Sequence, residues 1–208
     1  MILAAYLPLT LCDYPGKVAA MVFTQGCNFR CPWCHNPHLI PLKGTTPPLD
    51  PEVVVQEVAA RRRRGIVEAI VVSGGEPTLH SDLSDFLGRC KAAGLAVKLD
   101  TNGSRPEVLR TCFDRGLVDF VAMDVKAPWS QYATLAGINV DVESVQTSMR
   151  LIAASGLPHQ FRTTRVQPPL DEADFAEISV QIPSGSPHVW QPFRPVPGRS
   201  NRDWPNAD

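Results

Sequence analysis

The 208-residue chain lacks any apolar run that approaches the roughly 18–20 residues of a membrane span. Its first stretch, Met1 to Leu11, is apolar but has no basic region and carries Pro8, so we expect no secretory signal. An excess of either charge is also missing. The 20 Lys and Arg residues face 21 Asp and Glu residues, which argues against a protein that coats nucleic acids. These absences predict a cytoplasmic protein with neither a membrane nor a nucleic-acid partner.

Neither an internal repeat nor a second domain boundary is visible in the sequence. Hydrophobic residues make up 44% of the chain and charged residues 20%, a balance that excludes disorder for the chain as a whole. We therefore expect one domain over residues 1–195. Residues 196–208 are polar and proline-rich, which predicts an irregular C-terminal tail.

Short β-rich runs alternate with helical patterns along the chain. Several runs are rich in Val and Ile with little polar alternation, as in parallel strands that are buried on both faces. The predicted strands are Ala19–Thr24, Ala69–Ser73, Ala96–Leu99, Phe120–Asp124, Gln160–Thr164 and His188–Gln191. This alternation favours a parallel sheet, either open and doubly wound or curled into a full or partial barrel.

Five helices have start signals between these strands. Asp50 precedes a proline and a glutamate, which is typical of an N-cap and the first helical position. Ser81, Ser104, Asp141 and Asp171 precede the other four helical patterns, and their side chains are of the types that cap helices.

Glycines and polar residues gather where the predicted strands end. The carboxyl ends of parallel strands meet at one edge, where α/β folds bind their ligands. Several such clusters in one chain predict a single composite site. They contain Gln25-Gly26-Cys27, Gly74-Gly75-Glu76-Pro77, Asp100-Thr101-Asn102-Gly103, Asp124-Val125-Lys126, Arg162-Thr163 and Gln191-Pro192-Phe193.

Three cysteines, Cys27, Cys31 and Cys34, are spaced Cys-x3-Cys-x2-Cys on one of these loops. Three thiolates so close together suit a soft metal ion or an iron–sulfur cluster. A 4Fe–4S cluster held by three cysteines leaves one iron open to another ligand. The alternative is a structural zinc ion, for which the adjacent His35 is an awkward fourth ligand.

The other cysteines are scattered. Cys90 and Cys112 lie on apolar helix faces, where we expect small buried hydrophobic side chains, and Cys12 has no partner in its surroundings. The run Arg61 to Arg64 ends the first predicted helix, where cations favour the helix dipole. Nucleic-acid binding and protein docking are the alternative interpretations of this run.

The cysteine loop, with Trp33 before its last cysteine, resembles the radical S-adenosylmethionine superfamily. Gly74-Gly75-Glu76 matches the second motif of that superfamily. The segments CDYPGKVAAMVFTQGCNFRCPWCHNP, DTNG and MDVKAP resemble the activating enzymes of glycyl radical enzymes more closely. The nearest likeness is to the activating protein of anaerobic ribonucleoside-triphosphate reductase, followed by the pyruvate formate-lyase activator. The resemblance runs from about Leu11 to about Pro195.

The resemblance implies a partial (βα)6 barrel of parallel strands and a 4Fe–4S cluster on Cys27, Cys31 and Cys34. The open iron would bind the amino and carboxylate groups of S-adenosylmethionine. One electron, from a flavodoxin or a ferredoxin, would cleave this cofactor to methionine and a 5′-deoxyadenosyl radical. That radical would take a hydrogen atom from a glycine of a partner protein, which we expect to be an anaerobic ribonucleotide reductase.

The glycine-rich turn would then serve S-adenosylmethionine. Gly74 and Gly75 would let the backbone approach its methionine moiety. Glu76 would accept a hydrogen bond from its ammonium group, or else fix the turn.

The resemblance also assigns roles to charged residues at the strand ends. Asp100, Thr101 and Asp124 match a site for a monovalent cation, Na⁺ or K⁺. The alternatives are a turn or capping role for Asp100 and an ion pair for Asp124. Lys126 would contact the cofactor carboxylate or ribose, unless it forms only an ion pair. A charged Arg162 needs an anionic partner inside the site, such as the cofactor carboxylate.

Three further residues complete the expected site. Trp33 and Gln191 are candidates for contact with the adenine ring. His35 would either hydrogen-bond near the substrate or order the cysteine loop.

Two other functions stay open at this point. The first is a radical S-adenosylmethionine enzyme that acts on a small molecule, as the 7-carboxy-7-deazaguanine synthases do. The second is a non-enzymatic metal-binding or regulatory module, which predicts stable zinc binding and tolerance of Glu76→Ala.

Overall fold

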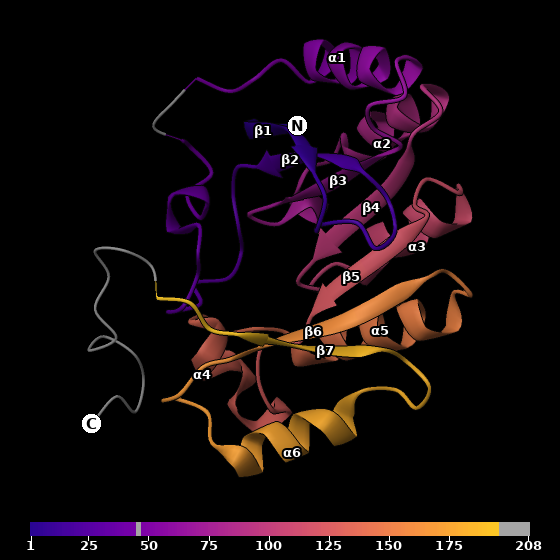
Figure 1. Ribbon diagram of the computed structural model, residues 1–208. Helices are drawn as coiled ribbons and strands as arrows, with labels where there is room; N and C mark the ends of the chain where they lie inside the picture. Colours follow the sequence, from indigo (N-terminus) through magenta and orange to yellow (C-terminus); the bar gives the residue numbers. More distant parts are fainter. Residues whose placement is uncertain (45–46, 196–208) are drawn as a thin grey trace.

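A computed structural model describes residues 1–44 and 47–195, so the predicted tail at residues 196–208 lies outside the described part. One seven-stranded sheet runs in chain order from β1 to β7 (Figure 1). Strands β2 to β7 pair in parallel, and β1 pairs antiparallel with β2. The strands are β1 (Leu3–Thr10), β2 (Ala19–Thr24), β3 (Ala69–Gly74), β4 (Ala96–Thr101), β5 (Phe120–Asp124), β6 (His159–Arg165) and β7 (His188–Pro192). Since no pairing joins β1 to β7 within the described residues, the sheet is an unclosed barrel, and the predicted partial barrel is confirmed.

Strand β1 is an addition to the predicted fold. Leu3 is buried, whereas Leu7 and Leu9 are each 41% exposed, because β1 is an edge strand that pairs only with β2 along most of its length. Such an edge strand buries only part of its side chains, so it lacks the continuous buried pattern that identified the parallel strands.

The helices cover one face of the sheet. Figure 1 shows α1, α2, α3 and α5 along the outer side of the curved sheet, with α6 beside β6 and β7. Their bounds are α1 (Pro51–Arg63), α2 (Leu83–Ala92), α3 (Pro106–Asp114), α4 (Tyr132–Ala136), α5 (Val142–Ala154) and α6 (Glu172–Gln181). Short 3-10 turns occupy Pro37–Leu39, Pro77–Leu79 and Trp129–Gln131. Within the described ranges, no helix combines the length and apolar character that a membrane crossing needs.

Three of the five predicted helix starts are confirmed. The side chains of Asp50, Asp141 and Asp171 each accept a hydrogen bond from a backbone N–H in the first turn. At the other two helices the predicted caps are wrong by one residue. Asp82 rather than Ser81 precedes α2, and Arg105 rather than Ser104 precedes α3. Neither Asp82 nor Arg105 accepts a capping hydrogen bond with its side chain, and without such a cap the first residue of a helix is defined only to within one or two positions.

The two faces of the sheet have different surroundings. Ala20 and Val22 of β2 face the helices and join the main hydrophobic core. Ala19 and Met21 face the opposite, concave side and form a smaller apolar cluster with Tyr14 and residues of β3. This cluster lies toward the amino ends of the strands, and it forms an apolar floor beneath the polar carboxyl ends.

Candidate active site

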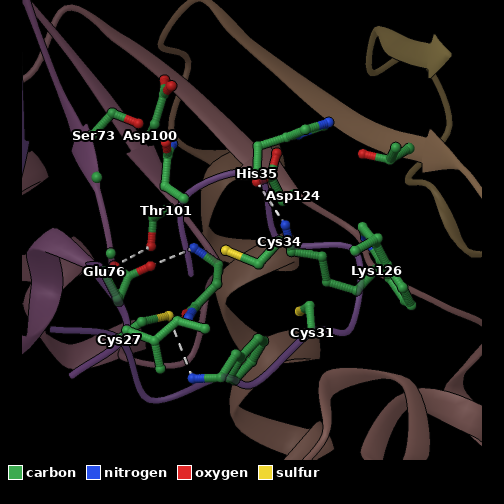
Figure 2. A pocket seen from close by; sticks show the side chains of 18 of the residues that line it. Cys27, Cys31, Cys34, His35, Ser73, Glu76, Asp100, Thr101, Asp124 and Lys126 are labelled. Carbon is green, nitrogen blue, oxygen red and sulfur yellow. Dashed lines mark hydrogen bonds and ion pairs between the residues drawn. The ribbon is translucent and has the colours of Figure 1, made fainter. Parts of the chain in front are cut away.

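One pocket gathers the polar residues that follow the strands (Figure 2). All the residues that the sequence analysis assigned to a site line this pocket. They are Cys27, Cys31, Trp33, Cys34, His35, Gly74, Gly75, Glu76, Asp100, Thr101, Asp124, Lys126, Arg162 and Gln191. The strand ends therefore do build a single composite site. Asn102, from the predicted cluster after β4, also lines it, and so do five residues that sequence reasoning missed, Phe29, Asn36, Ile40, Ser73 and Thr164.

The cysteine loop leaves the end of β2 and is tied to two other segments. The backbone N–H groups of Gly26 and Cys27 donate to the carbonyls of Leu39 and Ile40 at 2.8 and 3.0 Å. Farther along the loop, the Arg30 N–H donates to a carbonyl at the end of α4 at 2.7 Å. These bonds hold the loop in place over the pocket independently of any ligand.

Cys31 of this loop is buried, and Cys27 is partly buried. Burial raises the pKa of Cys27 to about 12 and that of Cys31 to about 11, although a backbone N–H of Phe29 donates to the Cys27 sulfur at 3.4 Å. A metal centre would supply the positive charge that the thiolates need. Among the described residues, no three Cys, His, Asp or Glu side chains are arranged to hold a single metal ion. A 4Fe–4S cluster offers each cysteine its own iron, so three thiols around one pocket fit it.

Gly74 and Gly75 are required by packing. Gly74 has a φ of +122°, and a Cβ there would lie 2.1 Å from the Thr24 nitrogen. A Cβ on Gly75 would lie 2.0 Å from the Gly26 carbonyl oxygen. The Glu76 N–H donates to that same carbonyl at 2.7 Å. The glycine turn thus packs directly on the base of the cysteine loop.

Glu76 joins two turns of the site. Its carboxylate is buried at 1% exposure. One oxygen accepts from the Thr78 N–H at 3.0 Å and from the hydroxyls of Thr78 and Thr101 at 2.6 and 2.8 Å. The other oxygen accepts from the Asn102 N–H at 2.6 Å. Burial raises the pKa of Glu76, and these hydrogen bonds lower it again in part. These hydrogen bonds fix the turn, which is one of the two roles expected of Glu76.

A side-chain relay links the turn after β4 to the cysteine loop. The Asn102 amide donates to Asn28 at 2.9 Å, and the Asn28 amide donates to the Ser104 hydroxyl at 2.9 Å. The turn after β3, the turn after β4 and the cysteine loop are consequently one hydrogen-bonded unit.

Five charged side chains alternate in sign across the pocket, and we call them the charge chain. It runs Lys98, Asp100, Arg162, Asp124, Lys126. The Lys98 ammonium donates to one Asp100 oxygen, and Arg162 donates to the other at 3.1 Å. Arg162 also donates to one Asp124 oxygen at 2.8 Å, and Lys126 donates to the other at 2.9 Å. The anionic partners of Arg162 are thus two carboxylates of the chain itself.

The pairings of Asp124, Arg162 and Lys126 keep these three members of the charge chain ionised. Burial by itself would raise the pKa of Asp124, but Arg162 and Lys126 hold it well below its ordinary range. Burial would lower the pKa of Arg162 and of Lys126, yet the neighbouring carboxylates raise both. All three groups are therefore charged at neutral pH.

The residues at the expected cation site do not fit a monovalent metal ion. All four carboxylate oxygens of Asp100 and Asp124 already accept from an ammonium or guanidinium group. The Thr101 hydroxyl donates to Glu76 and accepts from the Gly103 N–H at 3.1 Å. Three protein cations already balance two carboxylates, so a further cation would be repelled.

His35 connects the cysteine loop to the segment after β7. Its Nε2 lies 3.0 Å from the Arg194 carbonyl, and its ring stacks on Phe193 with centroids 5.8 Å apart. These contacts tie the cysteine loop to the segment after β7.

Helix α4 contacts the cysteine loop and the segment after β5, and it has no counterpart in the sequence predictions. Tyr132 is fully buried, accepts from the Lys126 N–H at 3.3 Å and donates to the Asp124 carbonyl at 3.4 Å. The Phe29 ring of the cysteine loop packs edge-on against it at 6.4 Å. The buried tyrosine hydroxyl therefore links α4 to the end of β5.

Residues outside the pocket follow the simpler expectations. Cys90 and Cys112 are fully buried in the core, and Cys12 is exposed. Arg61 pairs with Glu57 one turn earlier on α1 at 3.0 Å.

Comparison with known proteins identifies the family. The sequence model of the Radical SAM superfamily matches residues 21–180 of this chain. The chain belongs to the radical S-adenosylmethionine superfamily. It is therefore a radical S-adenosylmethionine enzyme, whose family uses a 4Fe–4S cluster and S-adenosylmethionine.

Several relatives share its sequence. A Methanocaldococcus jannaschii protein, assigned by name to the glycyl-radical enzyme activating enzymes, is 32% identical over 93% of this chain and 80% of its own length. A pyruvate formate-lyase-activating enzyme of Listeria monocytogenes is 34% identical over 55% of this chain. A 7-carboxy-7-deazaguanine synthase of Aquifex aeolicus is 29% identical over 43% of it. The match spans less than half the length of the last two proteins, 48% and 38%. The resemblance to activating enzymes is thus confirmed.

Solved structures share the fold at low sequence identity. Streptococcus suis SuiB bound to S-adenosylmethionine superposes with a TM-score of 0.63 and 13% identity, over 84% of this chain and 40% of SuiB. The enzyme anSMEcpe with bound S-adenosylmethionine superposes with a TM-score of 0.59 and 13% identity, over 82% of this chain and 50% of anSMEcpe. These likenesses support the unclosed barrel.

Proposed function

We propose that this chain is an activating enzyme that generates a glycyl radical on a partner enzyme, an anaerobic ribonucleotide reductase. The observation that carries the proposal is the 32% identity to the Methanocaldococcus jannaschii activating enzyme across 93% of this chain. The choice of an anaerobic ribonucleotide reductase as partner rests on sequence resemblance. The segments around the cysteine loop and after β4 and β5 resemble the activating protein of that reductase.

When bound, the reduced 4Fe–4S cluster and S-adenosylmethionine supply a 5′-deoxyadenosyl radical that takes a hydrogen atom from glycine, with methionine as the other product. Cys27, Cys31 and Cys34 hold the cluster in this proposal. A flavodoxin or a ferredoxin supplies the electron. Hydrogen bonds to α4 and to the segment after the loop keep the three thiols around one pocket.

The charge chain provides the positive end of the pocket. Three cations and two carboxylates leave a net charge of +1, which favours the carboxylate of a bound amino acid. Arg162 is held between the carboxylates of Asp100 and Asp124, whereas Lys126 donates to Asp124 alone and its side chain is more exposed, 20% against 14%. Lys126 is therefore the better candidate for the cofactor carboxylate or ribose.

Two pocket residues are proposed to contact adenine. Gln191 lies at the end of β7 and is exposed, whereas Trp33 in the cysteine loop is 4% exposed. Gln191 therefore has more surface to offer the base. Gly74, Gly75 and Glu76 position the backbone of their turn for the methionine moiety.

The unclosed sheet supports a protein substrate. Within the described residues the strands do not encircle the pocket, since β1 and β7 remain unpaired with each other (Figure 1). A backbone glycine can reach a buried site only if the segment that carries it can also enter. We propose that such a segment enters along the side where β1 and β7 do not pair.

The test is a radical-transfer assay by electron paramagnetic resonance. Anaerobically reconstituted protein is mixed with S-adenosylmethionine, dithionite and a candidate anaerobic ribonucleotide reductase. We expect a glycyl radical signal that disappears when the radical glycine of the reductase is replaced by alanine. Formation of 5′-deoxyadenosine without a glycyl signal would contradict the proposed function.

A second candidate function is the conversion of a small molecule, as in the 7-carboxy-7-deazaguanine synthases. It is favoured by the 29% identity to the Aquifex aeolicus enzyme over 89 residues. A pterin substrate distinguishes the two. If the pterin is consumed and the reductase stays radical-free, this second function replaces the first.

A further inference from the structure

Lys98 is a buried ammonium that sequence reasoning did not assign to the site. It lies on β4, two residues before Asp100, so both side chains are on the concave face of the sheet. Lys98 is 1% exposed, and its ammonium lies 6.0 Å from the centre of the Phe120 ring at the edge of the apolar floor. A lysine in such surroundings is costly to fold unless an anion compensates its charge.

The compensating anion is Asp100. The Lys98 ammonium donates to one oxygen of this carboxylate, and Arg162 donates to the other. Asp100 itself is 7% exposed and lies at the rim of the pocket beside Thr101. Lys98 thus neutralises, from beneath, a carboxylate that faces the proposed cofactor.

We propose that Lys98 is the resident counter-ion of Asp100 and takes the role that the sequence resemblance assigned to Na⁺ or K⁺. It is a positioning residue that acts through Asp100. S-adenosylmethionine binding by this chain therefore needs no monovalent metal ion. The inference rests on membership of the radical S-adenosylmethionine superfamily, and it does not depend on which partner carries the glycine.

The balance of charges within the five-residue charge chain supports this assignment. The charge chain already contains three cations for two carboxylates, and a metal ion would bring a fourth. Replacing Lys98 by a neutral residue leaves two cations for two carboxylates and frees one Asp100 oxygen. That variant has both the charge and the ligand atom with which to recruit a metal cation.

The first measurement uses the wild-type protein. The dissociation constant of S-adenosylmethionine is measured on the anaerobically reconstituted protein by calorimetry, from no K⁺ or Na⁺ to about 0.1 M of either. Tetramethylammonium chloride keeps the ionic strength constant, because it screens charge without coordinating oxygen. We expect a change of less than about twofold. A wild-type affinity that rises about tenfold with K⁺ or Na⁺, the scale of one charge-assisted contact, overturns the proposal.

The second measurement uses Lys98→Met, which keeps an unbranched side chain one atom shorter and removes its charge. We expect this variant to bind S-adenosylmethionine about tenfold more weakly without metal ions and to recover with K⁺ or Na⁺. Its melting temperature without cofactor should also rise with these ions, whereas that of the wild type should not. The counter-ion role is overturned if Lys98→Met folds but its affinity for S-adenosylmethionine and its melting temperature do not change with K⁺ or Na⁺.

Two controls separate this role from a general loss of charge. Lys91→Met removes an ammonium that contacts Asp119 at 2.6 Å outside the pocket, and it should behave as the wild type toward both ions. The double variant Lys98→Met with Asp100→Asn removes the carboxylate as well and should not gain ion sensitivity. If Lys98→Met does not fold, the wild-type titration still decides the proposal.

Discussion

Replacing Glu76 with glutamine tests whether this residue holds the site together before any ligand binds. The substitution exchanges one carboxylate oxygen for an NH2 group of the same size. In one orientation the new NH2 group faces the Asn102 N–H, which donates to Glu76 at 2.6 Å in the wild type. In the other orientation it faces the Thr78 N–H. Neither backbone donor can turn away to find another acceptor. Each buried polar group left without a partner costs about 1–3 kcal/mol. Loss of a buried charge offsets part of this cost. We therefore expect Glu76→Gln to lower the free energy of unfolding by about 2–4 kcal/mol.

The assay is urea unfolding followed by circular dichroism without S-adenosylmethionine. Glu57→Gln is the matched control, because Glu57 forms an exposed ion pair with Arg61 that contributes less than about 1 kcal/mol. If Glu76 served only as a ligand for the cofactor, its replacement would leave the ligand-free protein as stable as the wild type, or more stable. That result would refute the structural role. The same reasoning means that intolerance of Glu76→Ala no longer separates an enzyme from a metal-binding module.

Three further predictions concern stability. Gly75→Ala should cost more than about 3 kcal/mol in urea unfolding, because its Cβ would lie 2.0 Å from a carbonyl oxygen, whereas Gly88→Ala in α2, with its nearest neighbour at 3.9 Å, should stabilise the protein by up to about 1 kcal/mol. Asp141→Ala should cost about 1 kcal/mol through loss of the α5 N-cap, and no change would contradict that cap. Burial lowers the pKa of His80, so its neutral form favours folding. This contribution is complete above about pH 6.5 and is lost as the pH falls through the lower folded-state pKa. The advantage of the wild type over His80→Gln in urea unfolding should therefore be constant above about pH 6.5 and shrink as the pH falls below it; a difference that stays the same below that pH would exclude this effect.

The parallel strands could be predicted from sequence because their side chains are buried on both faces. The bounds of β2 and β5 match the prediction at both ends, and those of β3 differ by one residue. The carboxyl ends of these strands also located the pocket, since the topology of a parallel sheet brings all of them to one edge.

The partners of the charged residues could not be predicted in the same way. Arg162 meets Asp100 and Asp124 because β4, β5 and β6 lie in a particular register, which no local pattern encodes. Lys98 was overlooked because a lysine within a strand usually faces solvent. One local signal was present, since residues two apart in a strand share a face, and this placed Lys98 beside Asp100.

Reductive cleavage of S-adenosylmethionine is the most direct test of the central claim. The wild type and a Cys27/Cys31/Cys34→Ala triple variant are reconstituted anaerobically, analysed for iron and sulfide, and assayed for 5′-deoxyadenosine with dithionite. A Cys90→Ala variant is the matched control, because Cys90 is a buried core thiol outside the pocket. We expect cluster and product in the wild type and in Cys90→Ala, and neither in the triple variant. A wild-type protein that holds no iron, or a triple variant that forms as much product as the wild type, would contradict the claim.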